Sequence, residues 1–134
     1  EEASRRSLDN IVFKDEIHPD EIPALYEQCS VGIVALDQRH KSHNIPGKFL
    51  SYMQSGIPVL ANINPGNDLA EIIKNDRVGV VCENSDIDDL EKKTMQLIDM
   101  IDSNSDFYTR CRTVYGKLFS PENAVEQIVY EFNN

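Results

Sequence analysis

Short apolar runs that alternate with helical segments constrain the fold of this chain most strongly. The runs Val31–Leu36, Val59–Ile63 and Val78–Val81 are almost continuously apolar, the pattern of strands that are buried on both faces of a parallel sheet. A shorter apolar run, Ile11–Phe13, precedes them. Since segments with helical periodicity separate the runs, we expect an α/β fold, a Rossmann-like parallel sheet of four strands with helices on both faces.

The helical segments carry recognisable start and stop signals. His18-Pro19 opens the first helix, and Pro46 opens a second one that Gly56 ends. Ser85 is the expected N-cap of a long amphipathic helix. Further helices are expected near residues 69–73, from about 106 to 117, and from Ser120-Pro121 onward. The last helix is expected to bury an apolar stripe of Ala124, Val125, Ile128, Val129 and Phe132.

Size, charge and cysteine content narrow the function classes. The 134 residues suffice for one domain, residues 1–134, with a single core. A net charge of −10 argues against nucleic-acid binding, which needs a basic face. No apolar run approaches the length of a membrane span, about 20 residues. The three cysteines are widely spaced, which favours a reducing cytoplasm over a disulfide framework.

The loop that follows Val31–Leu36 has a charge opposite to that of the whole chain. No Asp or Glu occurs between Gln38 and Asn67, while Arg39, Lys41 and Lys48 are cationic. The loop leads into a helix N-terminus at the carboxyl end of a strand, where parallel sheets bind ligands. Gly47 would let a ligand approach the backbone closely. These features favour a phosphate or diphosphate site. The alternative is a solvated loop whose cations only keep the protein soluble.

Other chemistries find little support in the sequence. The acidic run 86–91 suits the first turn of a helix, and its EF-hand pattern fails because Leu97 takes the place of the last ligand. His40 and His43 share a loop with Arg39 and Lys41, which disfavours a cation. Walker, GxSxG and GxGxxG motifs are absent from the sequence. We expect neither a metal nor a cofactor.

The stretch from residue 46 to residue 61 reads PGKFLSYMQSGIPVLA. It resembles the donor-site signature of the retaining glycosyltransferases with two Rossmann-like domains (GT-B), family 4 or group 1, which reads roughly P-x-K-x-x-E-Y-M-A-x-G-x-P-V-x-A. Four flanking stretches, residues 9–13, 21–26, 68–73 and 119–123, also fit that family in order and spacing. The resemblance covers residues 8 to 132 and extends to the bacterial acetyl-fucosamine transferases of O-antigen and capsule synthesis.

The resemblance implies a nucleotide-sugar-binding domain whose donor is usually UDP-linked. The chain corresponds to the C-terminal half of such an enzyme, so its first strands and the domain for a lipid-linked saccharide acceptor are expected before residue 1. The implied ribose partner is Ser51, where the family carries a glutamate, and His43 replaces a second one. Lys14 and Ile17 would contact the base, with Arg39 and Lys41 as electrostatic support. The expected diphosphate and sugar contacts are His43, Asn44, Ile45, Pro46, Gly47 and Lys48.

Three functions are compatible with the sequence. The leading one is an enzyme part that serves retaining glycosyl transfer, inactive without its acceptor domain and lying in the cytoplasm or on the inner face of the plasma membrane. The second is a non-catalytic nucleotide-sugar-binding or scaffold subunit, which Ser51 would suit. The third is a flavodoxin-like regulatory domain, which needs acidic residues where this loop is basic. In the family the last helix packs onto the other domain, so its apolar stripe is expected to lack a complete cover here, which suggests a homodimer of the fragment.

Overall fold

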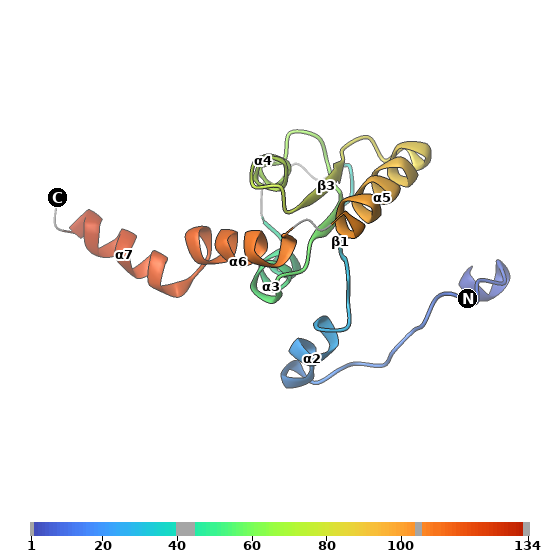
Figure 1. The fold of residues 1–134 in the computed structure, drawn as a ribbon, viewed down its shortest axis with the longest axis horizontal. Coiled ribbons are helices and arrows are strands. Elements are labelled where there is room, and N and C mark those ends of the chain that lie inside the picture. The colour runs from blue at the N-terminus through green and yellow to red at the C-terminus, as the bar shows by residue number, and fades with distance from the viewer. Residues whose placement is uncertain (1, 40–44, 104–105, 133–134) are drawn as a thin grey trace.

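A computed structural model describes residues 2–39, 45–103 and 106–132. Three parallel strands form an open sheet in the order β1-β2-β3: β1 is Gly32–Ala35, β2 is Val59–Asn62 and β3 is Gly79–Cys82. The register places Val34 opposite Ala61, and Ala61 opposite Val81. Helices connect the strands (Figure 1). The fold is therefore the predicted Rossmann-like parallel α/β sheet.

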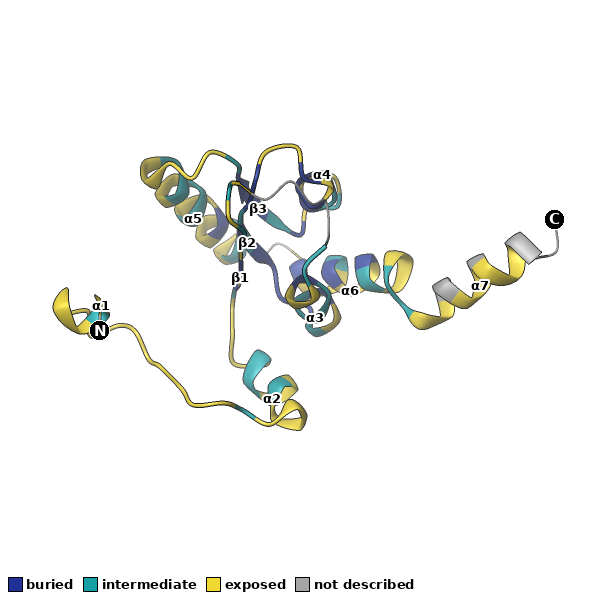
Figure 2. Cartoon of the chain, turned by 180° about the vertical axis from the view of Figure 1, so that it is seen from behind, coloured by how far each residue is buried: buried dark blue, intermediate teal, exposed yellow. Residues whose placement is uncertain are grey.

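Helices pack on both faces of the sheet. The larger core lies against α3 (Gly47–Ser55), α4 (Asp68–Asn75) and α6 (Phe107–Leu118), and α5 (Ile87–Asp102) covers the opposite face (Figure 2). The most deeply buried large side chains come from these helices and the strand ends; they are Phe49, Met53, Ile63, Leu69, Ile73 and Leu97. This core fixes the strand ends relative to α3.

The predicted fourth strand, Ile11–Phe13, is not formed. These residues run as extended chain between α1 (Glu2–Arg5) and the short helix η1 (Pro19–Glu21), with Val12 78% and Phe13 79% exposed. A strand needs a neighbour for its backbone groups, and no described segment pairs with this one. The apolar run alone therefore does not determine a strand, and the sheet has three strands instead of four.

The prediction that every strand is buried on both faces also fails for β1. Gly32 and Val34 are buried, but Ile33 is 60% exposed and Ala35 is exposed as well. The reason is that α5 packs on β3 and β2 and leaves that face of β1 uncovered. Only the face toward α3 is covered along all three strands.

Most helix boundaries follow the predicted signals. His18 caps η1, which continues into α2 (Ile22–Tyr26), and Gly56 ends α3 with a left-handed φ of 76°. The predicted N-cap of α5 was wrong by one residue. Asp86 holds that position and accepts a hydrogen bond from the amide of Asp89 at 2.9 Å. Ser85 instead adopts a φ of 51° and donates to Asn62.

The last helix, α7 (Pro121–Phe132), forms as predicted but does not bury its stripe. Val125, Ile128 and Val129 are each more than half exposed, at 58%, 57% and 51%. Ala124 and Phe132 belong to the same predicted stripe, but their side chains lie outside the described part of the structure. The helix extends away from the sheet and contacts α6, so it has no core to pack on (Figure 1).

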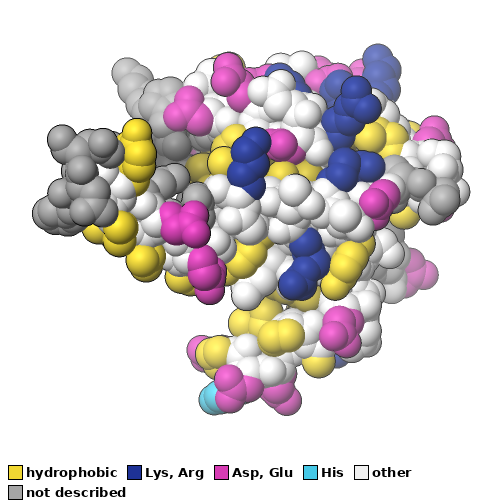
Figure 3. Space-filling view, turned by 60° about the vertical axis from the view of Figure 1, so that its left-hand side comes forward, with side chains coloured by type: hydrophobic (Ala, Val, Ile, Leu, Met, Phe, Trp, Pro, Cys, Tyr) yellow, Lys and Arg dark blue, Asp and Glu magenta, His cyan; other side chains and the backbone are white. Residues whose placement is uncertain are grey.

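The surface mixes charged and apolar side chains. Lys and Arg stand among Asp and Glu, with apolar patches between them (Figure 3). Among the described residues, no helix combines the length and the apolar character needed to cross a bilayer. The cysteines Cys29, Cys82 and Cys111 are free thiols.

Candidate functional site

The carboxyl ends of the three parallel strands lie at one edge of the sheet. Loops leave this edge after Ala35, after Asn62 and after Cys82, and the first leads into the N-terminus of α3. Open α/β sheets bind their ligands at this edge. It is also where the sequence predicts an anion site.

Two backbone amides at the N-terminus of α3 have no acceptor among the described residues. Pro46 precedes the helix in an extended conformation (φ −63°, ψ 138°) and provides no side-chain cap. The Phe49 amide donates to the Pro46 carbonyl at 2.9 Å, but the amides of Gly47 and Lys48 reach no acceptor among the described residues. A Cβ added to Gly47 would meet nothing within 4 Å. An anion could therefore approach these two amides.

The cations of the basic loop differ in their availability. Arg39 is paired with Asp37, with Nη2 2.6 Å from Oδ2 and Nε 3.0 Å from Oδ1. This hydrogen bond raises the pKa of Arg39, and Asp37 offsets its charge. Lys48 is exposed and forms no ion pair with any described residue. Lys41 and His40 lie outside the described residues, as do His43 and Asn44. Lys48 is thus the cation best placed for a ligand at α3.

Ser51 follows one turn after Gly47 on the same side of α3. It is half-buried, and its hydroxyl donates to the Gly47 carbonyl at 3.3 Å. The oxygen keeps its lone pairs for an incoming hydroxyl group. Ile45 and Pro46 are half-buried, and Ile45 packs against the larger core, so both hold the start of the helix in place. The structure therefore brings Pro46, Gly47, Lys48 and Ser51 together.

Lys14 and Ile17 are placed elsewhere. Both lie on the extended chain before η1, Lys14 exposed and Ile17 half-buried. That chain and α2 lie beyond the amino end of β1, whereas α3 begins after its carboxyl end (Figure 1). The structure does not bring these two residues to the N-terminus of α3, and their contact with a base stays a prediction.

Sequence reasoning missed a set of amides at the same edge. Asn64 and Asn67 are buried; Asn67 donates to Asn64 at 3.1 Å and caps α4 by accepting from the Leu69 amide at 3.0 Å. Gln38 donates to the Ile63 carbonyl at 2.8 Å, which ties the loop after β1 to the loop after β2. The sequence feature that could have indicated these amides is the pair of asparagines in the segment after Val59–Ile63. That segment has the composition of a simple turn.

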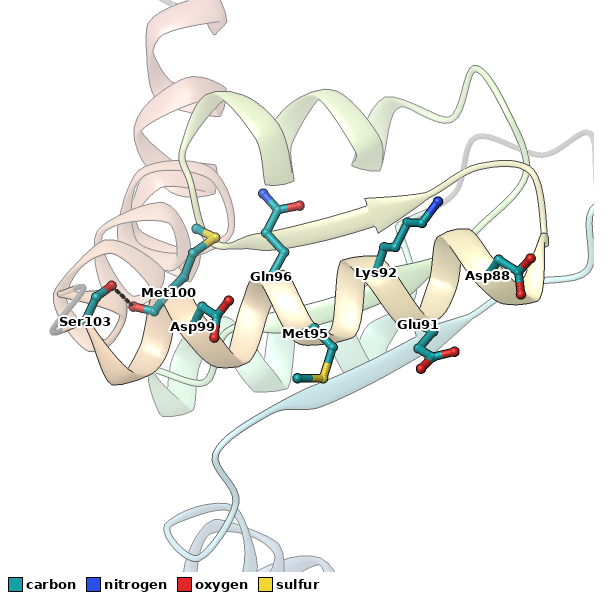
Figure 4. Close-up of a pocket in the computed structure, with 8 residues that line it drawn as sticks. All are labelled: Asp88, Glu91, Lys92, Met95, Gln96, Asp99, Met100 and Ser103. Carbon is teal, nitrogen blue, oxygen red and sulfur yellow. Dashed lines mark hydrogen bonds between the residues drawn. The ribbon is translucent and has the colours of Figure 1, made fainter.

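A hollow in the described part of the structure lies elsewhere, and the side chains that line it do not converge on a ligand. It measures about 880 Å³ and lies along α5. Its lining residues are Asp88, Glu91, Lys92, Met95, Gln96, Asp99, Met100 and Ser103. Figure 4 shows Glu91 and Met95 pointing to one side of the helix while Lys92 and Gln96 point to the other. Because a binding pocket needs groups that face one another, we assign it no role.

An open parallel sheet with helices on both faces and a helix that begins at its carboxyl edge defines the class of Rossmann-like domains. Within that class, residues 1–100 match the family described as Glycosyl transferases group 1. The chain belongs to this family. The matched residues include all three strands and most of α5, and end before α6. No curated protein and no solved structure matches the chain.

Proposed function

We propose that this chain is the donor-binding part of a glycosyltransferase that takes a sugar from a UDP-linked nucleotide. The acceptor would be a lipid-linked saccharide or polysaccharide of bacterial O-antigen or capsule synthesis, and transfer would retain the anomeric configuration. Family membership supports glycosyl transfer in general. The observation that carries the donor assignment is that the amides of Gly47 and Lys48 have no acceptor, and the Lys48 side chain no ion pair, among the described residues of this chain of net charge −10.

These groups suit the charge that glycosyl transfer creates. When the bond from the anomeric carbon to the donor diphosphate breaks, negative charge grows on the departing phosphate oxygen. The amides of Gly47 and Lys48, the dipole of α3 and the Lys48 ammonium would stabilise that charge in place. A ribose hydroxyl would donate to Ser51. Such a reaction takes place where nucleotide sugars are made, so we propose the cytoplasm or the inner face of the plasma membrane.

A second candidate is a subunit that binds a nucleotide sugar without transferring it. The observation in its favour is Ser51, a short uncharged side chain whose hydroxyl already donates to the Gly47 carbonyl. Transfer of labelled sugar by the protein that contains this chain would decide for the enzyme. Binding without turnover would decide for the subunit.

Calorimetric titration with UDP tests the donor assignment. We expect a dissociation constant of about 0.1–1 mM, because only one cation and two backbone amides would bind the diphosphate. Lys48→Ala removes one charged hydrogen bond, worth about 1.5–3 kcal/mol, and should weaken binding at least about tenfold. Lys92→Ala removes an equally exposed lysine of α5 and should leave binding unchanged. Added salt should weaken the wild type more than Lys48→Ala.

Equal affinity of Lys48→Ala and the wild type would overturn the assignment. So would the absence of heat at millimolar UDP.

A further inference from the structure

The outer edge of β3 carries backbone groups that have no partner among the described residues. The Val59 amide donates to the Val78 carbonyl at 3.0 Å, and the Ile63 amide donates to the Cys82 carbonyl at 3.0 Å. Since peptide groups alternate in direction along a strand, these bonds fix which residues face β2. The backbone groups of Gly79 and Val81 point the opposite way. No described residue accepts from their amides on that side.

A groove runs along this edge and is lined by cations. It measures about 320 Å³ and lies between the end of α4, β3 and α5. Lys74 and Arg77 are exposed, Lys93 is half-buried, and no acidic side chain of the described residues lines the groove. The lining residues are Lys74, Arg77, Gly79, Val80, Val81, Lys93, Gln96 and Met100. Glu83 offsets the charge of Lys74, and Arg77 and Lys93 keep the lining positive in a chain of net charge −10.

Hydrogen bonds fix the backbone of one of these residues and the side chain of another. Arg77 has a left-handed φ of 54°, a conformation that glycine adopts more readily, and its carbonyl accepts from Arg110 Nε at 2.9 Å. Lys74 Nζ lies 2.6 Å from Glu83 Oε2, which holds the ammonium near the far end of β3. A carboxylate on an incoming chain could share Lys74 with Glu83. The edge is therefore preorganised for a chain that runs along it.

We propose that the outer edge of β3 is a docking surface for an extended acidic segment of a partner protein, which pairs with Gly79 and Val81 as a further strand. Backbone hydrogen bonds would provide the affinity, and carboxylates facing Lys74, Arg77 and Lys93 would provide the specificity. A second copy of the chain fits poorly, because its own edge would bring the same cations into opposition. Charge complementarity thus selects an acidic partner.

Amide NMR with a short blocked peptide of alternating valine and glutamate tests the proposal. The Gly79 and Val81 amides should shift and exchange more slowly with water on titration, whereas a peptide of alternating valine and lysine should leave them unchanged. Equal shifts with both peptides, or shifts at neither residue, would overturn the proposal. Shifts of the same two amides with protein concentration alone would also overturn it, because they would indicate pairing between copies.

Two variants separate the backbone contribution from the charge contribution. Val81→Pro removes the outward amide, which edge strands tolerate, and should abolish the slowed exchange at Gly79. Lys93→Glu should weaken binding of the acidic peptide at least about fivefold, and Lys92→Glu, with the same charge change outside the groove, should weaken it less. Should Val81→Pro fail to fold, Lys93→Glu decides. Wild-type affinity in Lys93→Glu, or an equal loss in Lys92→Glu, contradicts the proposal.

Discussion

Cys111 shows how burial changes the chemistry of one residue. Its side chain lies fully buried in α6 as part of the larger core, and burial raises the pKa of its thiol to about 12 from an ordinary value near 9. The thiolate is the reactive form of cysteine, so this residue is inert at neutral pH. Exposed Cys29 is the thiol that reagents should reach first.

The raised pKa of Cys111 predicts a loss of stability in alkali. The folded chain keeps the thiol protonated up to about pH 12, whereas the unfolded chain releases the proton above about pH 9. The folded state therefore holds more protons in that window, and the free energy of unfolding falls as pH rises. The fall due to this thiol should be about 1 kcal/mol between pH 9 and pH 10. Urea denaturation at both pH values measures it.

Cys111→Ala should lose that part of the pH dependence, since alanine does not titrate. Cys29→Ala is the matched control, because it removes a thiol that is exposed and lies outside the core. A slope in Cys111→Ala as steep as in the wild type would assign the alkaline effect to other groups.

The start of α3 could be predicted from the sequence, because local residue preferences determine where a helix begins. Gly47, Lys48 and Ser51 occupy the start of α3 because a proline-led helix follows an apolar strand, and both features are visible in the sequence. The pairing of Arg39 with Asp37 could not be derived, because it depends on the conformation of the loop. Asn64 and Asn67 were missed because their amides become buried only when β2 and α4 pack together.

At the scale of elements, the apolar pattern of a segment does not determine its structure alone; the segments that pack beside it also matter. The runs that became β1, β2 and β3 pair with one another, so their apolar pattern was sufficient. Ile11–Phe13 has the same apolar pattern, but no described segment pairs with it, and it stays extended chain. The apolar stripe of α7 has helical spacing, and α7 forms a helix. The spacing of apolar residues does not indicate which surface will cover the stripe.

Two glycines provide a matched test of helix geometry. Gly56 ends α3 with a φ of 76°, and a Cβ there would lie 2.3 Å from a Tyr108 ring carbon. Gly56→Ala should therefore cost at least about 1–2 kcal/mol. Gly116 lies within α6 with nothing within 4 Å of an added Cβ, so Gly116→Ala should stabilise by about 0.5–1 kcal/mol. Thermal unfolding measures both, and shifts of the same sign would contradict this geometry.

At the scale of the whole molecule, α7 leaves apolar surface uncovered. Val125, Ile128 and Val129 are each more than half exposed, and exposed apolar stripes tend to associate. We predict a concentration-dependent dimer through α7. Sedimentation should show Ile128→Glu to be monomeric where the wild type is dimeric, while Ile87→Glu, at an exposed position on α5, should dimerise normally. A strictly monomeric wild type would contradict this prediction.

The central claim is that the carboxyl edge of the sheet binds a nucleotide diphosphate. The sequence predicted this edge from the order of strands and the charge of one loop. There, the amides of Gly47 and Lys48 and the Lys48 ammonium have no partner among the residues that the structure describes. Amide NMR during titration with UDP tests the claim most directly. It predicts shifts centred on residues 45–51 at high micromolar to millimolar UDP, lost in Lys48→Ala. Shifts confined to the acidic start of α5, residues 86–91, or no shifts at millimolar UDP, would contradict it.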